Sequence, residues 1–201
     1  MDLATTSTFA LAFLVFAASP GPDNVTILSR TVNDGPAHGI AYAAGMVTSI
    51  LGFVVLAALG FNALSATLGE HLRLVRYAGA AYLIYTGISM WRAPVALAPR
   101  RLRGGLARLF ATGLLLNVSN PKMPVFYLAL LPGVLGTRPL TLPDTMTLLA
   151  VILVVEALVV AAHVLVAVRA KAALAQPRRL RALNRGAGAL MVGAGALVAS
   201  R

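Results

Sequence analysis

Two proline-containing motifs interrupt segments that are otherwise apolar enough to cross a membrane. They read Ser19-Pro20-Gly21-Pro22-Asp23-Asn24 and Asn120-Pro121-Lys122-Met123-Pro124. Proline removes a backbone donor and clashes with the preceding helical turn, and lipid offers no replacement hydrogen bonds. Helices broken at membrane depth are therefore tolerated where protein or a polar cavity satisfies the freed backbone groups. Two such breaks, one in each half of the chain, predict the binding site of a membrane transporter.

The composition supports a bilayer as the solvent. Of the 201 residues, 59% are hydrophobic and 11% are charged, whereas soluble domains carry about a quarter charged residues. The net charge of +11 comes from basic residues in short loops between apolar runs, without an aromatic-interleaved basic surface. We therefore read the charge as a topology signal and expect no nucleic-acid partner. Because the chain has no Cys, disulfides and thiolate metal sites are excluded.

The apolar runs predict an all-α integral membrane protein with six transmembrane helices, of which the first and fourth are broken. Phe9 to Ala18 has no basic leader, so it predicts a first helix rather than a cleaved signal peptide. The six spans are expected at about Thr6 to Ser29, His38 to Ala63, Leu72 to Trp91, Leu109 to Leu131, Thr145 to Val168 and Leu183 to Ser200.

Arginine-rich loops predict the topology. The connections after the third and fifth spans carry most of the basic residues, whereas the connection between the fourth and fifth has only Arg138, opposed by Asp144. The positive-inside rule places the two basic loops in the cytoplasm and both termini outside. The chain is expected to be one multi-pass domain, residues 1–201. It divides into a first half at about 1–92, a cytoplasmic linker at about 93–107 and a second half at about 108–201. An odd number of helices per half predicts two inverted three-helix repeats.

The charged residues of the two breaks are the first candidates for chemistry. Asp23 follows Pro22, which suits the first turn of a resuming helix, where the positive end of the helix favours a carboxylate. It could bind a substrate ammonium or a coupling proton, or it could only cap the helix. Lys122 would lie in the first turn of a helix capped by Asn120 and begun by Pro121. A cation opposes the dipole there, so a substrate carboxylate or an ion pair with Asp23 would account for it.

Polar residues within the spans extend this candidate site. Asn24 and Asn117 could satisfy backbone groups freed by the breaks or contact the substrate. Glu156 and His163 share a helix face, and Glu156 could carry a proton, whereas His163 is expected at the membrane interface. Small residues, among them Gly39, let helices approach closely, either within one chain or between copies in a homo-oligomer. The predicted substrate-binding residues are Pro20, Gly21, Pro22, Asp23, Asn24, Asn117, Asn120, Pro121 and Lys122, and the proton-coupling candidates are Asp23 and Glu156.

Several of these motifs resemble a known family. The run from Pro20 to Asn24 is similar to the first-helix signature of the LysE/RhtB family of amino-acid exporters. The runs from Arg76 to Gly87, Phe110 to Lys122 and Phe126 to Pro132 resemble its third- and fourth-helix motifs. The resemblance implies a six-helix inner-membrane exporter of amino acids or similar metabolites, driven by proton antiport.

We therefore expect a secondary transporter for a small zwitterionic metabolite, with protons and the lipid bilayer as its other partners and no cofactor. Export of another small cation or a metal ion is an alternative, although few membrane carboxylates are available for a metal. A non-transporting scaffold subunit is a further alternative. An enzyme acting on lipid is disfavoured, because the chain has no Ser-His-Asp, HExxH or paired-carboxylate motif.

Overall fold

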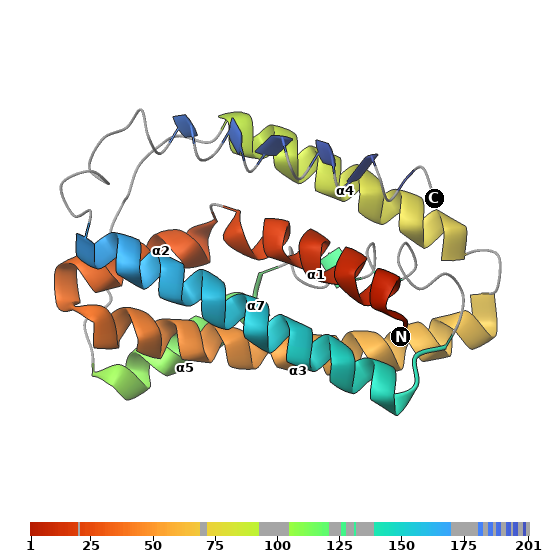
Figure 1. Ribbon diagram of the computed structural model, residues 1–201, viewed down its shortest axis with the longest axis horizontal. Coiled ribbons are helices and arrows are strands. Elements are labelled where there is room, and N and C mark those ends of the chain that lie inside the picture. The colour runs from red at the N-terminus through yellow and green to blue at the C-terminus, as the bar shows by residue number, and fades with distance from the viewer. Residues whose placement is uncertain are drawn as a thin grey trace.

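The computed structural model describes residues 1–19, 21–68, 72–92, 105–120, 126–127, 131 and 139–169, with short stretches between 181 and 199. The described residues form helices and no strand. The long elements are α1 (Leu3–Ala18), α2 (Pro22–Asp34), α3 (Pro36–Leu68), α4 (Leu72–Arg92), α5 (Leu106–Val118) and α7 (Leu142–Arg169). They run roughly along the long axis of an elongated bundle (Figure 1).

The helices fall where the sequence predicts membrane spans. The 27 residues of Pro36–Asn62 and the 28 of Leu142–Arg169 are each long and apolar enough to cross a bilayer. A third candidate span is the pair α1 and α2, which are bent by 58° relative to each other. Helix α4 lies in the third predicted span, α5 begins the fourth, and short helical stretches between 181 and 199 lie in the sixth. The all-helical class is confirmed, and the elements fit a count of six.

The break in the first span follows from local sequence. Helix α1 begins where the Asp2 carboxylate accepts a 2.7 Å hydrogen bond from the Thr5 amide, and it ends at Ala18. The chain is extended at Ser19 and Gly21, and α2 then starts with proline at its first position. That position suits Pro22, because its missing N–H would have had no partner inside the helix.

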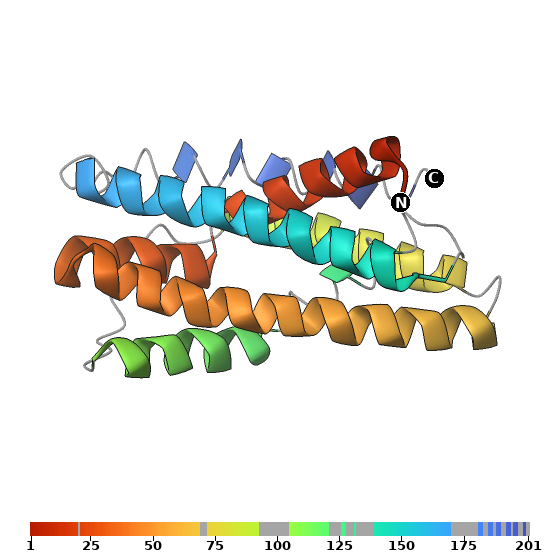
Figure 2. The same cartoon turned by 60° about the horizontal axis from the view of Figure 1, so that its bottom comes forward.

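The main helix contacts join the two halves of the sequence. Helix α3 packs most extensively on α5, and α7 packs against α1, α2 and α3. Figure 2 shows α5 on one side of α3 and α7 on the other. Gly45 of α3 and Gly113 of α5 allow the close approach, since a Cβ atom on either would overlap the backbone of the partner helix. A Cβ on Gly39 would likewise overlap Thr31 of α2, so these small-residue faces meet within one chain.

Aromatic side chains fill the core around the break. Phe9, Phe13 and Phe16 line one side of α1 and are buried. Phe126, from the region of the fourth span, stacks on Phe16 with ring centroids 3.8 Å apart and contacts Phe13 at 6.0 Å. This cluster continues into buried side chains of α3 and α7. The first broken span is thereby packed against the fourth.

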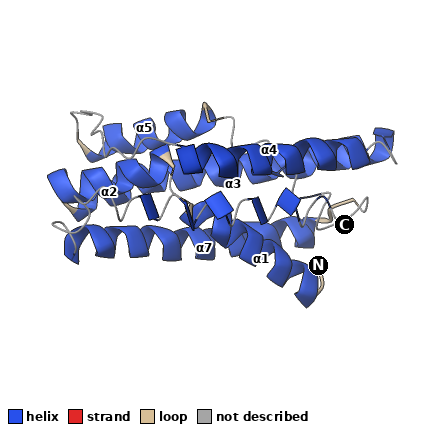
Figure 3. Cartoon of the chain, turned by 90° about the horizontal axis from the view of Figure 1, so that it is seen from above, coloured by secondary structure: helices blue, strands red, loops and turns tan. Residues whose placement is uncertain are grey.

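Helix α4 lies along one side of the bundle with the short stretches of residues 181–199 (Figures 1 and 3). The contact is close, because a Cβ on Gly87 would come within 2.6 Å of the Gly188 carbonyl oxygen. The Trp91 indole also donates a 2.9 Å hydrogen bond to the Arg185 carbonyl.

The two ends of the bundle carry different helix termini and contacts. Helices α4 and α7 run toward the same end of the bundle, and their last residues are Arg92 and Arg169 (Figure 1). At the other end the N-terminal ammonium contacts Asp144, and Asn62 exchanges two hydrogen bonds of 2.9 and 2.7 Å with the backbone of Leu140. The orientation in the membrane and the inverted repeat stay predictions.

Candidate functional site

Asn24 holds the helix break together. Its side-chain amide donates hydrogen bonds to the carbonyl oxygens of Ala17, at 2.7 Å, and Ser19, at 2.9 Å. These carbonyls lie at the end of α1, where no further helical turn supplies N–H donors. Asn24 itself is buried. The expectation that Asn24 satisfies backbone groups freed by the break is therefore confirmed.

Asp23 is held by side chains from other parts of the bundle. The Tyr42 hydroxyl of α3 donates to Asp23 Oδ1 at 2.7 Å. The Asn117 amide of α5 donates to Asp23 Oδ2 at 3.1 Å, and the Asn120 amide donates to the same oxygen at 3.4 Å. None of these donors belongs to α2, so helix capping does not account for the carboxylate. Asp23 instead ties the break of the first span to α3 and to the end of α5.

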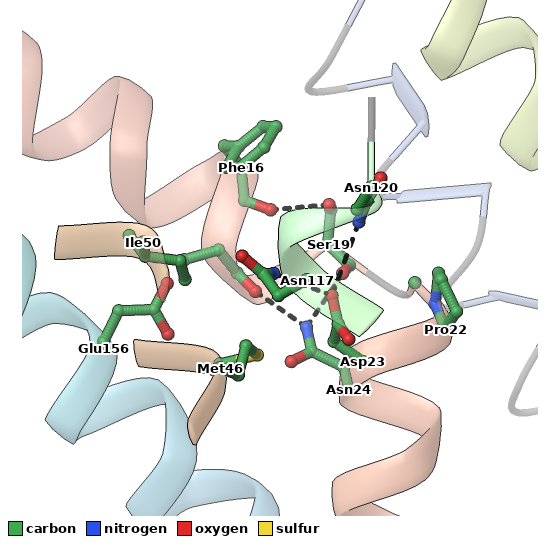
Figure 4. A pocket seen from close by; sticks show the side chains of 12 residues that line it. Phe16, Ser19, Pro22, Asp23, Asn24, Met46, Ile50, Asn117, Asn120 and Glu156 are labelled. Atoms are coloured by element: carbon green, nitrogen blue, oxygen red, sulfur yellow. Dashed lines mark hydrogen bonds between the residues drawn. The ribbon is translucent and has the colours of Figure 1, made fainter. Parts of the chain in front are cut away.

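A cavity opens beside this cluster (Figure 4). Its volume of about 40 Å³ is enough to hold water. The polar groups facing it come from the break of the first span, from the end of α5 and from α7, whereas its apolar wall comes from α1 and α3. The described lining residues are Phe16, Ala17, Ser19, Gly21, Pro22, Asp23, Asn24, Met46, Ile50, Asn117, Asn120 and Glu156.

Glu156 brings a second carboxylate to this cavity. It lies in the middle of α7 and is only 2% exposed. Figure 4 shows Glu156 and Asp23 projecting from different helices, with Asn117 drawn between them. A buried carboxylate in a membrane span is costly and marks a functional candidate. Tyr127, from the region of the fourth span, is also fully buried.

Asn117 has an unusual hydrogen-bond state. Its side chain is 1% exposed, and its amide nitrogen is committed to Asp23. Its carbonyl oxygen Oδ1 is buried without a hydrogen-bond partner. Buried polar atoms in proteins are nearly always paired, so an unpartnered acceptor on a cavity wall indicates a place for a donor that comes from outside the protein.

The structure brings together six of the nine predicted substrate-binding residues. Gly21, Pro22, Asp23, Asn24, Asn117 and Asn120 all line the one cavity, together with the proton-coupling candidate Glu156. The other three predictions, Pro20, Pro121 and Lys122, lie outside the described residues. Their placement therefore stays a prediction.

Other polar residues of the spans are used locally. The Thr26 hydroxyl donates to the Pro22 carbonyl at 2.6 Å, and the Ser119 hydroxyl donates to the Leu115 carbonyl at 2.9 Å. The His163 Nδ1 atom lies 2.7 Å from the Val159 carbonyl oxygen, one turn back in the same helix. No group of three His, Cys, Asp or Glu residues in the described part of the chain could hold a metal ion.

The contribution of α3 to the site was not predicted from the sequence. Tyr42, Met46 and Ile50 are spaced by four residues, which places them on one face of the helix. All three are buried, with Tyr42 reaching Asp23 and the other two lining the cavity. A tyrosine hydroxyl within an apolar span needs a hydrogen-bond partner, and that need is the signal that could have identified Tyr42.

Comparisons with known proteins identify the family of this chain. A sequence model of the family described as LysE type translocator matches residues 14–201. The chain is 32% identical over 197 residues to a homoserine/homoserine lactone efflux protein of Salmonella typhimurium, covering 96% of this chain and 94% of the relative. It is 27% identical to an uncharacterized membrane protein of Vibrio cholerae, covering 100% and 98% of the two chains.

A leucine efflux protein of Salmonella choleraesuis is 27% identical over 125 residues, which are 61% of this chain and 59% of the relative. No solved structure matches. The match to the family spans both helix breaks and the apolar helices that surround them. The chain is therefore a membrane transport protein and belongs to the LysE type translocator family.

Proposed function

We propose that this protein exports an amino acid or a related small zwitterionic metabolite across the inner membrane. The observation that carries the proposal is the Asp23 carboxylate, held beside a cavity at the break of the first span. A fixed carboxylate at membrane depth is suited to bind an ammonium group. The relatives named as homoserine/homoserine lactone and leucine efflux proteins support an amino acid as the cargo.

The cavity offers each part of an amino acid a matching environment. Asp23 and Glu156 present carboxylates for the ammonium. Phe16, Met46 and Ile50 present an apolar wall that suits an uncharged side chain. We infer that Lys122 binds the substrate carboxylate, since it follows Asn120 and Pro121 at the second break. A zwitterion would then bridge the two broken spans.

Proton antiport would use a carboxylate that alternates between its protonated and ionised forms. Glu156 is the better candidate, because it is almost fully buried within a span and lies on the cavity wall opposite the Asp23 cluster. Protonation of Glu156 would remove one negative charge from the cavity. The affinity of the cavity for the substrate ammonium would then fall. Asp23, with three donors around it, would stay the substrate anchor.

Alternating access would follow from movement of one three-helix half against the other around this cavity. Contacts such as α3 with α5 join the halves, and Asp23 sits where three of the helical elements converge. Substrate binding would add contacts to the hydrogen-bond network that already joins Asp23 to α3 and α5. The movement is thereby linked to occupancy of the site.

The proposal is tested by uptake of labelled amino acids into inside-out vesicles with an imposed proton gradient. Gradient-dependent uptake is expected in the parent and should be lost in Asp23→Asn and Lys122→Gln. Glu156→Gln should lose uptake driven by the gradient but retain exchange of labelled for unlabelled substrate. The matched control is Asp144→Asn, which changes an aspartate near a helix start far from the cavity.

The outcomes separate the alternatives. Uptake that survives both Asp23→Asn and Lys122→Gln, with the proteins inserted, would contradict the site. Uptake of a small cation without a carboxylate, and of no amino acid, would favour the cation exporter. No uptake of any panel member would favour the scaffold.

A further inference from the structure

The number of hydrogen bonds around Asp23 limits how it can bind an ammonium. A carboxylate has about four lone-pair sites. Three are used by Tyr42, Asn117 and Asn120, so about one is left for a ligand. A primary ammonium carries three N–H donors, and burial leaves each unpaired donor costly. Two further acceptors on the cavity wall are therefore needed to pair all three donors.

Asn117 Oδ1 supplies such an acceptor. Because the amide nitrogen donates to Asp23, the orientation of the amide is fixed and its oxygen is directed away from that carboxylate. The oxygen is buried and has no partner. Asn117 also lines the cavity beside Asp23 and Glu156. One side chain thus positions the substrate anchor and presents a second acceptor next to it.

We propose that Asn117 Oδ1 accepts a hydrogen bond from the substrate's ammonium group, so that the site selects primary amines over N-methylated ones. The inference rests on the proposed function and adds the class of amine and the residue that recognises it. Each methyl group on nitrogen removes one donor and leaves an acceptor of the site unpaired. A site that hydrogen-bonds a ligand group strongly rejects analogues without that group. An apolar pocket discriminates much less between ligands that differ by one small group.

The discriminating measurement is ligand-induced stabilisation of the purified, detergent-solubilised protein. The probes are leucine, N-methylleucine and N,N-dimethylleucine, with homoserine as a second primary amine. In the parent we expect N,N-dimethylleucine to bind roughly 10- to 100-fold more weakly than leucine, as for the loss of a hydrogen bond to a charged group. N-methylleucine should fall between them.

Two variants assign this preference to the oxygen of Asn117. Asn117→Leu should weaken leucine binding and reduce the preference over the dimethyl compound to within a fewfold. Asn120→Leu is the matched control, because it also removes a donor to Asp23 Oδ2. It should weaken binding of all the probes but keep the preference.

Three outcomes would overturn the inference. Equal binding of the three leucine compounds by the parent would show that affinity does not depend on the number of N–H donors on the ligand. A preference that persists in Asn117→Leu would assign it to steric exclusion of the methyl groups. If the parent bound no amino acid at all, either in detergent or in transport-competent vesicles, the proposed function would fail and the inference would fail with it. Leucine binding without discrimination would leave the proposed function standing.

Discussion

Two aspartates near helix starts have different surroundings. Asp144 is the third residue of α7, and its carboxylate accepts hydrogen bonds from the amide and the hydroxyl of Thr141, at 3.0 and 2.7 Å. It also contacts the N-terminal ammonium. Asp23 is the second residue of α2, but its hydrogen-bond donors come from α3, α5 and Asn120. A similar local position thus serves helix capping in one case and a cavity between helices in the other.

This difference shows how to separate a structural carboxylate from a functional one. Asp144 is 2% exposed and is satisfied mainly by its own helix start and the chain's N-terminus. Asp23 is only partly buried, faces a cavity, and depends on the packing of other helices for every partner. The first arrangement stabilises a helix end. The second holds a charge where a ligand can reach it.

The largest expected effect is on substrate affinity. Asp23→Asn should weaken substrate binding by about 2–5 kcal/mol, because the substrate ammonium inside the cavity loses its ionic partner. Asp144→Asn should leave affinity unchanged to within a fewfold. Concentration-dependent exchange in proteoliposomes measures both values. Equal losses of affinity in the two variants would remove the distinction between the aspartates.

The next effect is on stability. Asp144→Ala should lower the free energy of unfolding by about 2–4 kcal/mol, since it removes a helix cap and leaves the N-terminal ammonium without this partner. Thermal unfolding in detergent, followed by circular dichroism, measures the change. If Asp144→Ala unfolded at the same temperature as the parent, the Asp144 contacts would not stabilise the start of α7.

A smaller loss of stability is expected at the break. Asn24→Ala should cost about 1–3 kcal/mol, because the carbonyls of Ala17 and Ser19 lose their donor in a buried setting. Thr26→Val is the control, since the Thr26 hydroxyl bonds only within α2. The same unfolding measurement should show little change for the control. Comparable losses in both variants would contradict the role assigned to Asn24.

The smallest effect is expected from Tyr42→Phe. The change removes one donor to Asp23 and keeps the ring, so substrate affinity should change by about 0.5–1.5 kcal/mol. Substrate titration in the exchange assay measures this change in affinity. An effect as large as that of Asp23→Asn would mean that Tyr42 contacts the substrate directly.

The sequence predicted much of this arrangement, because proline and charge act locally. Pro22 sets the start of α2 through its missing N–H, and the apolar runs set the lengths of α3 and α7. Asn24 could be linked to the break because its partners lie within seven residues. These features need no knowledge of how the helices pack.

The contributions of distant residues could not be predicted in the same way. Tyr42 lies 19 residues from Asp23, and Asn117 lies 94 residues from it. Their contacts depend on the crossing of α2, α3 and α5, which the glycines at 45 and 113 permit but do not specify. Glu156 could be identified as a candidate from its place in a span, but not as a neighbour of the first break.

The most direct test of the account is binding of a labelled amino acid to the purified protein, compared among the parent, Asp23→Asn and Asp144→Asn. Scintillation proximity with leucine and homoserine measures binding without requiring transport or a proton gradient. The account predicts saturable binding by the parent and by Asp144→Asn, and a loss of roughly 30-fold or more in Asp23→Asn. Binding by Asp23→Asn that equals the parent's would contradict the assignment of Asp23 as the substrate anchor.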